Sequence, residues 1–231
     1  MYIVEGNIGV GKSTFIRLIN KLDSSIGIVP EPVENWTGKE YGQSLLAEFY
    51  KNPSRWAYTL ETLAMMSRVK NHLLETKNSN PFRLMERSVY SGHYCFAKND
   101  KQNKYLSSLE WQIYNSWIDF MIRKKLTPPL GFIYLQAKPE ICYDRVVCRN
   151  RKSEKELSLD YMKQIHNWHE RFLVKKEDLF ENIKNAPVLV LDCNEDFLNN
   201  KDKIKKHTEN IKAFMFQTTS CTQQPTKTLS K

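Results

Sequence analysis

The stretch Val4–Thr14, VEGNIGVGKST, decides the fold of this chain. Within it, Gly6 to Ser13 match the pattern G-x-x-x-x-G-K-[ST] in full, after a predicted strand (2–4) and before a predicted helix (about 12–22). Glycines here let backbone N–H groups curl around phosphate oxygens, and the N-terminus of the following helix adds partial positive charge. The stretch therefore predicts a loop that binds the phosphates of a nucleoside triphosphate.

Two side chains of this loop carry specific roles. We expect Lys12 to reach the β- and γ-phosphates and Ser13 to bind Mg²⁺. The predicted phosphate-binding residues are Gly6, Asn7, Ile8, Gly9, Val10, Gly11, Lys12, Ser13 and Thr14. The loop does not identify the acceptor of the phosphate, because GTPases, motor proteins and kinases of metabolites and nucleotides all contain it.

Outward from the loop, short β-rich runs alternate with longer helical patterns, which is typical of a parallel sheet with crossover helices. The predicted strands are 2–4, 26–29, 82–85, 130–136 and 187–192. The predicted helices cover about 12–22, 43–51, 54–77, 88–98, 107–126, 138–149, 158–184 and 199–215. The pattern predicts an α/β fold in which a five-stranded, doubly wound parallel sheet is flanked by helices.

Composition favours one globular domain without a membrane anchor. The chain has 231 residues, of which 41% are hydrophobic, enough for one large core. Its longest apolar runs are about as long as a strand and too short to span a membrane, and the phosphate loop begins too early for a signal peptide. The net charge of +9 permits nucleic-acid binding but suits polyanionic substrates equally well.

The cysteines and the C-terminal segment complete this outline. The five cysteines form no C-x-x-C pair and have scattered spacing, which argues against a disulfide framework and a zinc site. The short apolar runs and the early phosphate loop favour a cytoplasmic location. Residues 217–231, QTTSCTQQPTKTLSK, have almost no large apolar side chains and are predicted to form a disordered tail. The folded domain is therefore expected to cover residues 1–216.

Carboxylates that follow predicted strands are the next candidates, because ligands of an open α/β sheet bind beyond the carboxyl ends of its strands. Glu31 follows the second strand between two prolines, and Glu86 and Arg87 end the third. We expect Glu31 to orient an acceptor hydroxyl and take its proton. Arg87 would hold Glu31 and stabilise charge on the transferring phosphoryl group, and Glu86 would bind Mg²⁺ through water.

At this point the chain resembles a known family. Five motifs, GNIGVGKST, EPVENW, ERSVYSGHYCFAKN, DRVVCRNRKSEKE and LDCNEDF, occur in the order and spacing of the deoxyribonucleoside kinases, the family of deoxycytidine, deoxyguanosine and mitochondrial-type thymidine kinases. The resemblance extends from Tyr2 to about Phe216. It implies a P-loop kinase that transfers the γ-phosphate of ATP, with Mg²⁺, to the 5′-hydroxyl of a deoxyribonucleoside. It also implies a homodimer that pairs long helices.

The arginine-rich motif resembles the lid of this family, at about 149–157. Arg145, Arg149 and Arg151 are spaced so that all three could converge on a triphosphate. The resemblance further assigns Tyr50 and Glu154 to the 3′-hydroxyl of the sugar. It assigns the base of the phosphate donor to Glu195, Asp196 and Phe197.

The predicted base pocket departs from the family. On the pocket helix WAYTLETLAMMSRVK, which also carries Ala64, Glu61 stands where the family has a glutamine that donates and accepts at once. Arg68 is kept, but Gly92 replaces the aspartate that partners this arginine. We hypothesise that Glu61 and Arg68 together present an acceptor and a donor to the base. Cytosine, guanine, adenine and thymine can all be drawn in this pairing, with cytosine or a purine slightly favoured.

Other features of the pocket follow the family more closely or leave the function open. Trp36 and Phe96 match the aromatic residues that line and stack on the base.

Two other functions are compatible with the phosphate loop. A nucleoside monophosphate kinase of thymidylate-kinase type would need room for a phosphate beside Glu31, which repels it. A P-loop ATPase that binds nucleic acid would bind DNA or RNA with steep salt dependence and leave nucleosides unchanged.

Overall fold

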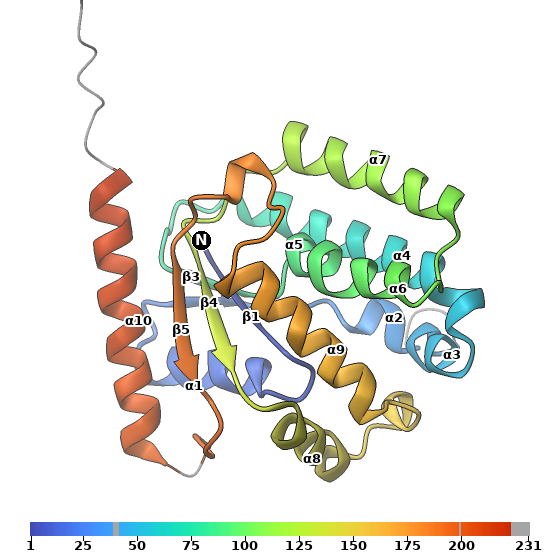
Figure 1. Cartoon of the computed structure of the whole chain (residues 1–231). Coiled ribbons are helices and arrows are strands. Elements are labelled where there is room, and N and C mark those ends of the chain that lie inside the picture. The colour runs from blue at the N-terminus through green and yellow to red at the C-terminus, as the bar shows by residue number, and fades with distance from the viewer. Residues whose placement is uncertain (39–41, 199, 223–231) are drawn as a thin grey trace, which may run out of the picture.

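The computed structural model describes residues 1–38, 42–198 and 200–222, and places a five-stranded parallel sheet at the centre of the molecule (Figure 1). The strands are ordered β2-β3-β1-β4-β5, and every neighbouring pair is parallel. They are β1 (Tyr2–Gly6), β2 (Gly27–Val29), β3 (Arg83–Glu86), β4 (Gly131–Gln136) and β5 (Val188–Asp192). The predicted α/β fold, with its five parallel strands, is confirmed.

The helices follow the strands as crossovers. The longer ones are α1 (Lys12–Leu22), α3 (Leu45–Lys51), α4 (Pro53–Glu75), α7 (Ser108–Lys124), α8 (Pro139–Arg149), α9 (Leu159–His169) and α10 (Lys201–Thr222). The short elements are α2 (Glu34–Thr37), α5 (Val89–Ser91), a π-helical segment (Gly92–Ala97), α6 (Lys98–Gln102), a 3₁₀ turn (Lys152–Glu154), a second π-helical segment (Glu170–Val174) and a second 3₁₀ turn (Glu181–Ile183). Local sequence begins several of them: Ser107 and Glu110 form a capping box at α7, and Asn52 caps α4 directly before Pro53.

Both faces of the sheet are covered, which explains why its strands read as continuous apolar runs. Alternate residues of β1 point to opposite faces. Tyr2 and Val4 pack in the core formed with α1, α8 and α10, whereas Ile3 packs in the core formed with α4 and α7. Figure 1 shows α10 and α7 on opposite sides of the sheet. The sheet is therefore a rigid platform whose carboxyl edge carries the loops considered below.

The predicted helix 158–184 is wrong in its second half. Helix α9 ends at His169, continues as a π-helical segment to Val174, and then leaves the helical path at Lys176 and Asp178, both with positive φ. The backbone N–H of Phe180 donates to the Tyr94 hydroxyl at 2.6 Å, so the chain folds back toward the sheet. This tertiary contact overrides the helical propensity of the segment.

The C-terminal helix also extends beyond its predicted end. We expected a disordered tail from residue 217, but α10 continues to Thr222. The Tyr2 hydroxyl donates to the carbonyl of Met215 at 3.0 Å and hydrogen-bonds the Thr218 hydroxyl at 2.6 Å. These bonds tie the last turns of α10 to β1, although the segment has few apolar residues. Residues 223–231 of the predicted tail lie outside the described part of the chain.

Candidate active site

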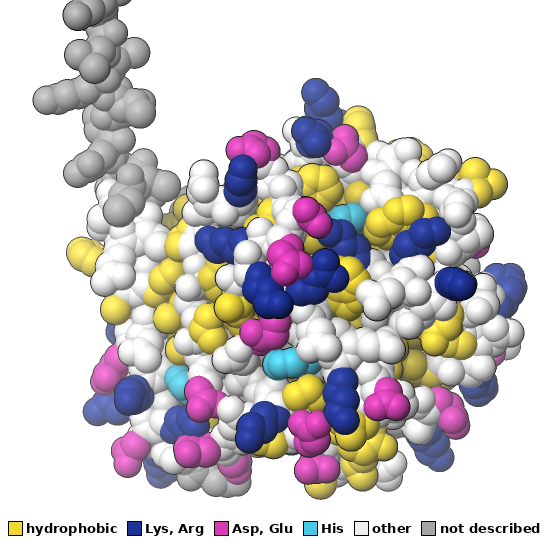
Figure 2. Space-filling model, in the orientation of Figure 1, with side chains coloured by type: hydrophobic (Ala, Val, Ile, Leu, Met, Phe, Trp, Pro, Cys, Tyr) yellow, Lys and Arg dark blue, Asp and Glu magenta, His cyan; other side chains and the backbone are white. Residues whose placement is uncertain are grey.

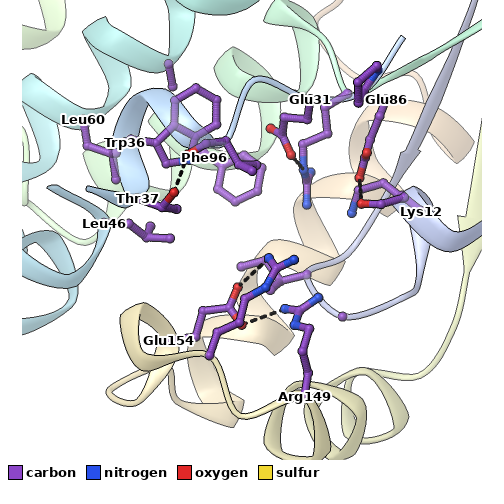
Figure 3. A pocket seen from close by; sticks show the side chains of 18 of the residues that line it. Lys12, Glu31, Trp36, Thr37, Leu46, Leu60, Glu86, Phe96, Arg149 and Glu154 are labelled. Carbon is purple, nitrogen blue, oxygen red and sulfur yellow. Dashed lines mark hydrogen bonds and ion pairs between the residues drawn. The ribbon is translucent and has the colours of Figure 1, made fainter. Parts of the chain in front are cut away.

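A cavity of about 290 Å³ opens at the carboxyl edge of the sheet, where the loops after β1, β2 and β3 meet. Figure 3 shows Lys12 and Glu86 on one side of it, Trp36, Leu60 and Phe96 on another, and Arg149 and Glu154 facing them. The predicted site residues that line the cavity are Ile8, Gly9, Gly11, Lys12, Ser13, Thr14, Glu31, Trp36, Tyr50, Glu61, Ala64, Arg68, Glu86, Arg87, Phe96, Arg149, Arg151 and Glu154. Segments that are distant in sequence are thus brought together at one site.

The phosphate loop has the backbone that its glycines predict. Gly9 and Gly11 have φ of +79° and +101°, and a Cβ at Gly9 would lie 2.3 Å from the carbonyl oxygen of Cys142. The Lys12 ammonium donates to the carbonyl oxygens of Gly6 and Asn7, at 3.0 and 2.8 Å. Burial, followed by the nearby Arg87, lowers the pKa of Lys12 to about 7. A phosphate beside Lys12 would favour its charged form and offer stronger acceptors than these carbonyls.

Three other loop residues contribute to the scaffold and do not line the cavity. The Asn7 side chain donates to the carbonyl of Met162 at 2.9 Å, which ties the loop to α9. Val10 is fully buried in the core, and Gly6 is the last residue of β1. Their predicted contacts with ATP can therefore come from the backbone of the loop.

The side chains of Ser13 and Glu86 are in contact at the N-terminus of α1. The Ser13 hydroxyl donates to Oε1 of Glu86 at 2.6 Å. Ser13 comes from the end of the phosphate loop, and Glu86 is the last residue of β3, next to β1 in the sheet. The neighbouring strands therefore place a hydroxyl and a carboxylate in direct contact beside the phosphate loop, where a metal ion with ATP would bind.

Glu31 is held by two arginines. Its Oε1 accepts from Nη2 and Nε of Arg68, at 2.6 and 3.2 Å, and its Oε2 lies 3.5 Å from Nε of Arg87. Burial alone would raise the pKa of Glu31, but the charges of Arg68, Arg87 and Lys12 outweigh it, so this pKa lies below its usual value. Glu31 is therefore an ionised and fixed hydrogen-bond acceptor near the phosphate loop.

Arg68 differs from its expected role. We predicted that it would act with Glu61 on the base, but its guanidinium is engaged with Glu31. Gly92 permits this position, because a Cβ there would lie 2.8 Å from Nη1 of Arg68. The sequence showed that Arg68 lacks the aspartate partner of the family, because Gly92 stands in its place. It did not show that Glu31 would be the carboxylate that binds Arg68 instead.

The wall of the cavity beyond Glu31 is largely apolar. Trp36 is buried and Phe96 is half-buried, and the guanidinium of Arg68 lies 5.5 and 5.9 Å from their ring centres. Ala64 leaves room on α4, and Glu61 places a carboxyl in this wall. A flat, apolar ring with a polar edge fits these surroundings.

The lid arginines do not all converge as expected. Arg149 Nη2 donates to Glu154 at 2.7 Å, and Arg151 lies 3.6 Å from the same carboxylate. Arg145 lies outside the cavity lining and donates to the carbonyls of Cys193, Asn194 and Glu195. Arg145 and Arg149 lie one turn apart on α8, as their spacing predicted. The guanidinium of Arg145, however, is bound by backbone carbonyls in the loop after β5.

The loop after β5 lies behind the phosphate loop. Phe197 is buried, its ring centre lies 5.5 Å from that of Phe15, and a Cβ at Gly11 would lie 2.8 Å from it. Glu195 is exposed and pairs with Lys203 at 2.9 Å. Neither these residues nor Asp196 line the cavity, so their predicted contacts with the donor base stay predictions.

Sequence reasoning missed part of the lining. The additional residues are Arg17, Pro30, Val33, Thr37, Leu46, Phe49, Leu60 and Tyr161. Leu60 lies one turn before Ala64 on α4, so helical spacing from Ala64 could have identified it. Tyr161 packs edge to face against Tyr50 at 6.1 Å, across a separation in sequence that no motif bridges.

Comparison with known proteins identifies relatives of this chain. The family model for deoxynucleoside kinases matches residues 2–216. The mitochondrial deoxyguanosine kinase of Xenopus laevis is 38% identical, over 92% of this chain and 88% of that protein. The deoxycytidine kinase of Homo sapiens is 35% identical, over 92% and 89%, and a probable deoxycytidine kinase of fowlpox virus is 34% identical, over 92% and 86%. With its phosphate loop, its arginine-held Glu31 and these matches, the chain belongs to the deoxynucleoside kinase family.

Proposed function

We propose that this chain transfers the γ-phosphoryl group of ATP to the 5′-hydroxyl of a deoxyribonucleoside, with Glu31 as the base. The observation that carries this assignment is the position of Glu31, ionised and fixed by Arg68 and Arg87 in the same cavity as Lys12. A nucleoside with its base between Trp36 and Phe96 would direct its sugar toward Tyr50 and Glu154 and its 5′-hydroxyl toward Glu31. Cytosine or a purine is the proposed base.

The residues divide the reaction between them. Glu31 accepts a hydrogen bond from the 5′-hydroxyl, which orients the oxygen for attack, and takes its proton as the bond to phosphorus forms. Lys12 and Arg87 stabilise negative charge on the transferring phosphoryl group. Arg149 and Arg151 would close on ATP when they exchange Glu154 for phosphate oxygens.

Mg²⁺ is the proposed metal. Ser13 and Glu86 are in contact with each other and supply oxygen ligands. Oxygen is the type of ligand atom that Mg²⁺ prefers. Ser13 would bind the ion directly, and Glu86 would bind it through water. When bound, Mg²⁺ neutralises charge on the phosphates of ATP.

The test is steady-state phosphorylation of deoxycytidine, deoxyguanosine, deoxyadenosine and thymidine with Mg-ATP, with dCMP and dTMP as control acceptors. We expect turnover of at least one nucleoside and none of the monophosphates, because Glu31 repels an acceptor phosphate. Turnover of a monophosphate alone would assign the chain to the thymidylate-kinase type. Absence of turnover with every acceptor would contradict the proposal.

We also propose a homodimer, because α7 exposes an apolar stripe. Leu109, Ile113, Trp117 and Phe120 are between 39% and 66% exposed and recur at helical spacing on one face. Adjacent α4 exposes Met66, Leu73 and Leu74. An apolar surface of this kind is typical of a subunit interface.

Trp117→Lys should convert the dimer to a monomer, since it places a charge in the centre of the proposed interface. Analytical ultracentrifugation of the wild type and the variant measures this, and Leu22→Lys on α1 is the control. Leu22 is similarly exposed at 54%, so its variant should sediment like the wild type. A monomeric wild type, or a Trp117→Lys variant that remains dimeric, would contradict the proposal.

The remaining proposals concern location and other partners. We propose a cytoplasmic location, as expected for a chain whose described cysteines, Cys95, Cys142, Cys148 and Cys193, are all free thiols. Cell fractionation would distinguish the cytosol from the mitochondrion. Within the described residues, no helix is long and apolar enough to cross a membrane. Nucleic acid is not a proposed partner: on the face shown in Figure 2 basic side chains are interspersed with acidic ones, and the net charge of +9 suits polyanionic substrates equally well.

A further inference from the structure

Glu61 places a carboxyl in the largely apolar part of the cavity wall. It lies on α4 with only 5% of its surface exposed, and among the described residues its Oε2 has no hydrogen-bond partner. Arg68 lies on the same helix but is bonded to Glu31, and Arg87 is also paired with Glu31. Glu61 is thus a buried carboxyl without a bonded cation, in the wall where the base is proposed to bind.

A second carboxyl lies behind it. Asp100 on α6 is fully buried, and neither of its oxygens has a hydrogen-bond partner within the described chain. Burial, and then the charge of Glu61, raise the pKa of Asp100 well above its usual value. Two neighbouring negative charges in an apolar wall repel each other strongly. Asp100 therefore stays neutral when Glu61 ionises.

The other groups around Glu61 leave it as the one that titrates near neutral pH. Burial raises the pKa of Glu61 to about 7, against the opposing charges of Arg68 and Arg87. Tyr114 on α7 and Tyr161 on α9 face the pair and stay neutral, because burial raises the pKa of both well above the usual value. Burial also lowers the pKa of His93, on the π-helical segment beside α4, to about 3, so it is uncharged.

The two forms of Glu61 offer different hydrogen bonds. A neutral carboxyl presents one O–H donor and one C=O acceptor, whereas a carboxylate presents acceptors alone. Cytosine and adenine carry an amino donor beside a ring-nitrogen acceptor, which complements the neutral form. Guanine carries two neighbouring donors, its ring N–H and its amino group, which complement the carboxylate.

We propose that Glu61 makes base selection depend on pH: its neutral carboxyl binds deoxycytidine or deoxyadenosine, and its carboxylate binds deoxyguanosine. This inference rests on the proposed function, since it places the nucleobase against Glu61. It identifies the proton of a single buried carboxyl as the feature that distinguishes the two substrate classes.

The test is the ratio of kcat/KM for deoxycytidine to kcat/KM for deoxyguanosine, measured with saturating Mg-ATP from about pH 6 to about pH 8.5. The ratio of neutral to ionised Glu61 falls tenfold for each pH unit, so we expect this ratio of kcat/KM values to fall by up to about tenfold per pH unit across the whole range. Titration of Lys12, Glu31 and ATP affects both nucleosides and therefore cancels in the ratio. A ratio that stays constant across this range would overturn the inference.

Two variants test whether the pH dependence of this ratio comes from Glu61. Glu61→Gln has nearly the same shape and no titrating proton, so its ratio should be independent of pH. Asp100→Asn should keep the fall of the wild type, because Asp100 is neutral throughout. A pH-dependent ratio in Glu61→Gln, or a constant ratio in Asp100→Asn, would overturn the assignment to Glu61. Thermal unfolding checks that both variants fold; if the wild type phosphorylates no nucleoside, the proposed function fails instead.

Discussion

Glu31→Gln should lower kcat for nucleoside phosphorylation by about 10²- to 10⁴-fold, the usual contribution of a general base. Glutamine keeps the size of the side chain and one carbonyl acceptor, but it cannot take the proton of the 5′-hydroxyl. Because Glu31 faces the acceptor side of the cavity, the KM for ATP should change by much less than kcat. Single-turnover measurements with saturating nucleoside and ATP would separate the chemical step from binding.

A matched control lies three residues away. Glu34 belongs to the same EPVENW motif but is exposed at the start of α2, so Glu34→Gln should retain nearly all of the activity. The variant Glu31→Gln also leaves Arg68 and Arg87 without their shared anion, so its thermal stability must be measured alongside. A folded Glu31→Gln enzyme with the kcat of the wild type would exclude Glu31 as the base.

Sequence predicted the parts of the site that depend on the ends of strands. The phosphate loop, Glu31, Glu86 and Arg87 all lie at or directly after the carboxyl ends of strands in a parallel sheet, and that rule alone gathers them at one edge. The contact between Ser13 and Glu86 follows from the order of the strands, because β3 lies directly beside β1. These residues could be found because topology, rather than side-chain conformation, brings them together.

Pairing of side chains could not be predicted in the same way. The sequence did not show that Arg68 bonds Glu31 and leaves Glu61 unbonded, or that its guanidinium lies so close to Gly92 that a Cβ there would be 2.8 Å from Nη1. Arg145 was expected to contact phosphate, but it binds backbone carbonyls that no sequence motif marks as acceptors. Long side chains with several possible partners are therefore where the sequence prediction and the structure differ.

Arg87 is the residue on which these arguments converge. Its backbone has φ of +60°, unusual for a side chain with a Cβ, and its N–H donates to the carbonyl of Val4 at 3.0 Å. The guanidinium lies 4.7 Å from the ring centre of Phe96 and 3.5 Å from Glu31, while its buried Nη1 has no partner among the described residues. A phosphoryl oxygen would satisfy that donor, and the strained backbone would then hold Arg87 between Glu31 and the transferring phosphoryl group.

Arg87→Lys and Arg87→Met should each lower kcat by about 10²- to 10³-fold, since a donor that stabilises transition-state charge is lost. Lysine should not rescue the activity, because its single ammonium group cannot contact Phe96, Glu31 and a phosphoryl oxygen at once. Arg171→Lys, at a half-buried arginine paired with Glu177, is the control and should have the kcat of the wild type. A fully active Arg87→Lys variant would show that a positive charge alone is sufficient at this position.

The pH dependence of the Arg87→Met variant tests the same role independently. Arg87 is one of the charges that hold the pKa of Glu31 below its usual value, so removal of Arg87 should raise this pKa. Because the carboxylate is the active form, the variant should lose its remaining activity at a higher pH than the wild type as the pH falls. If kcat falls but the pH at which activity is lost on the acid side stays the same, Arg87 acts on the phosphoryl group alone. If kcat falls and this pH rises, Arg87 also keeps Glu31 ionised.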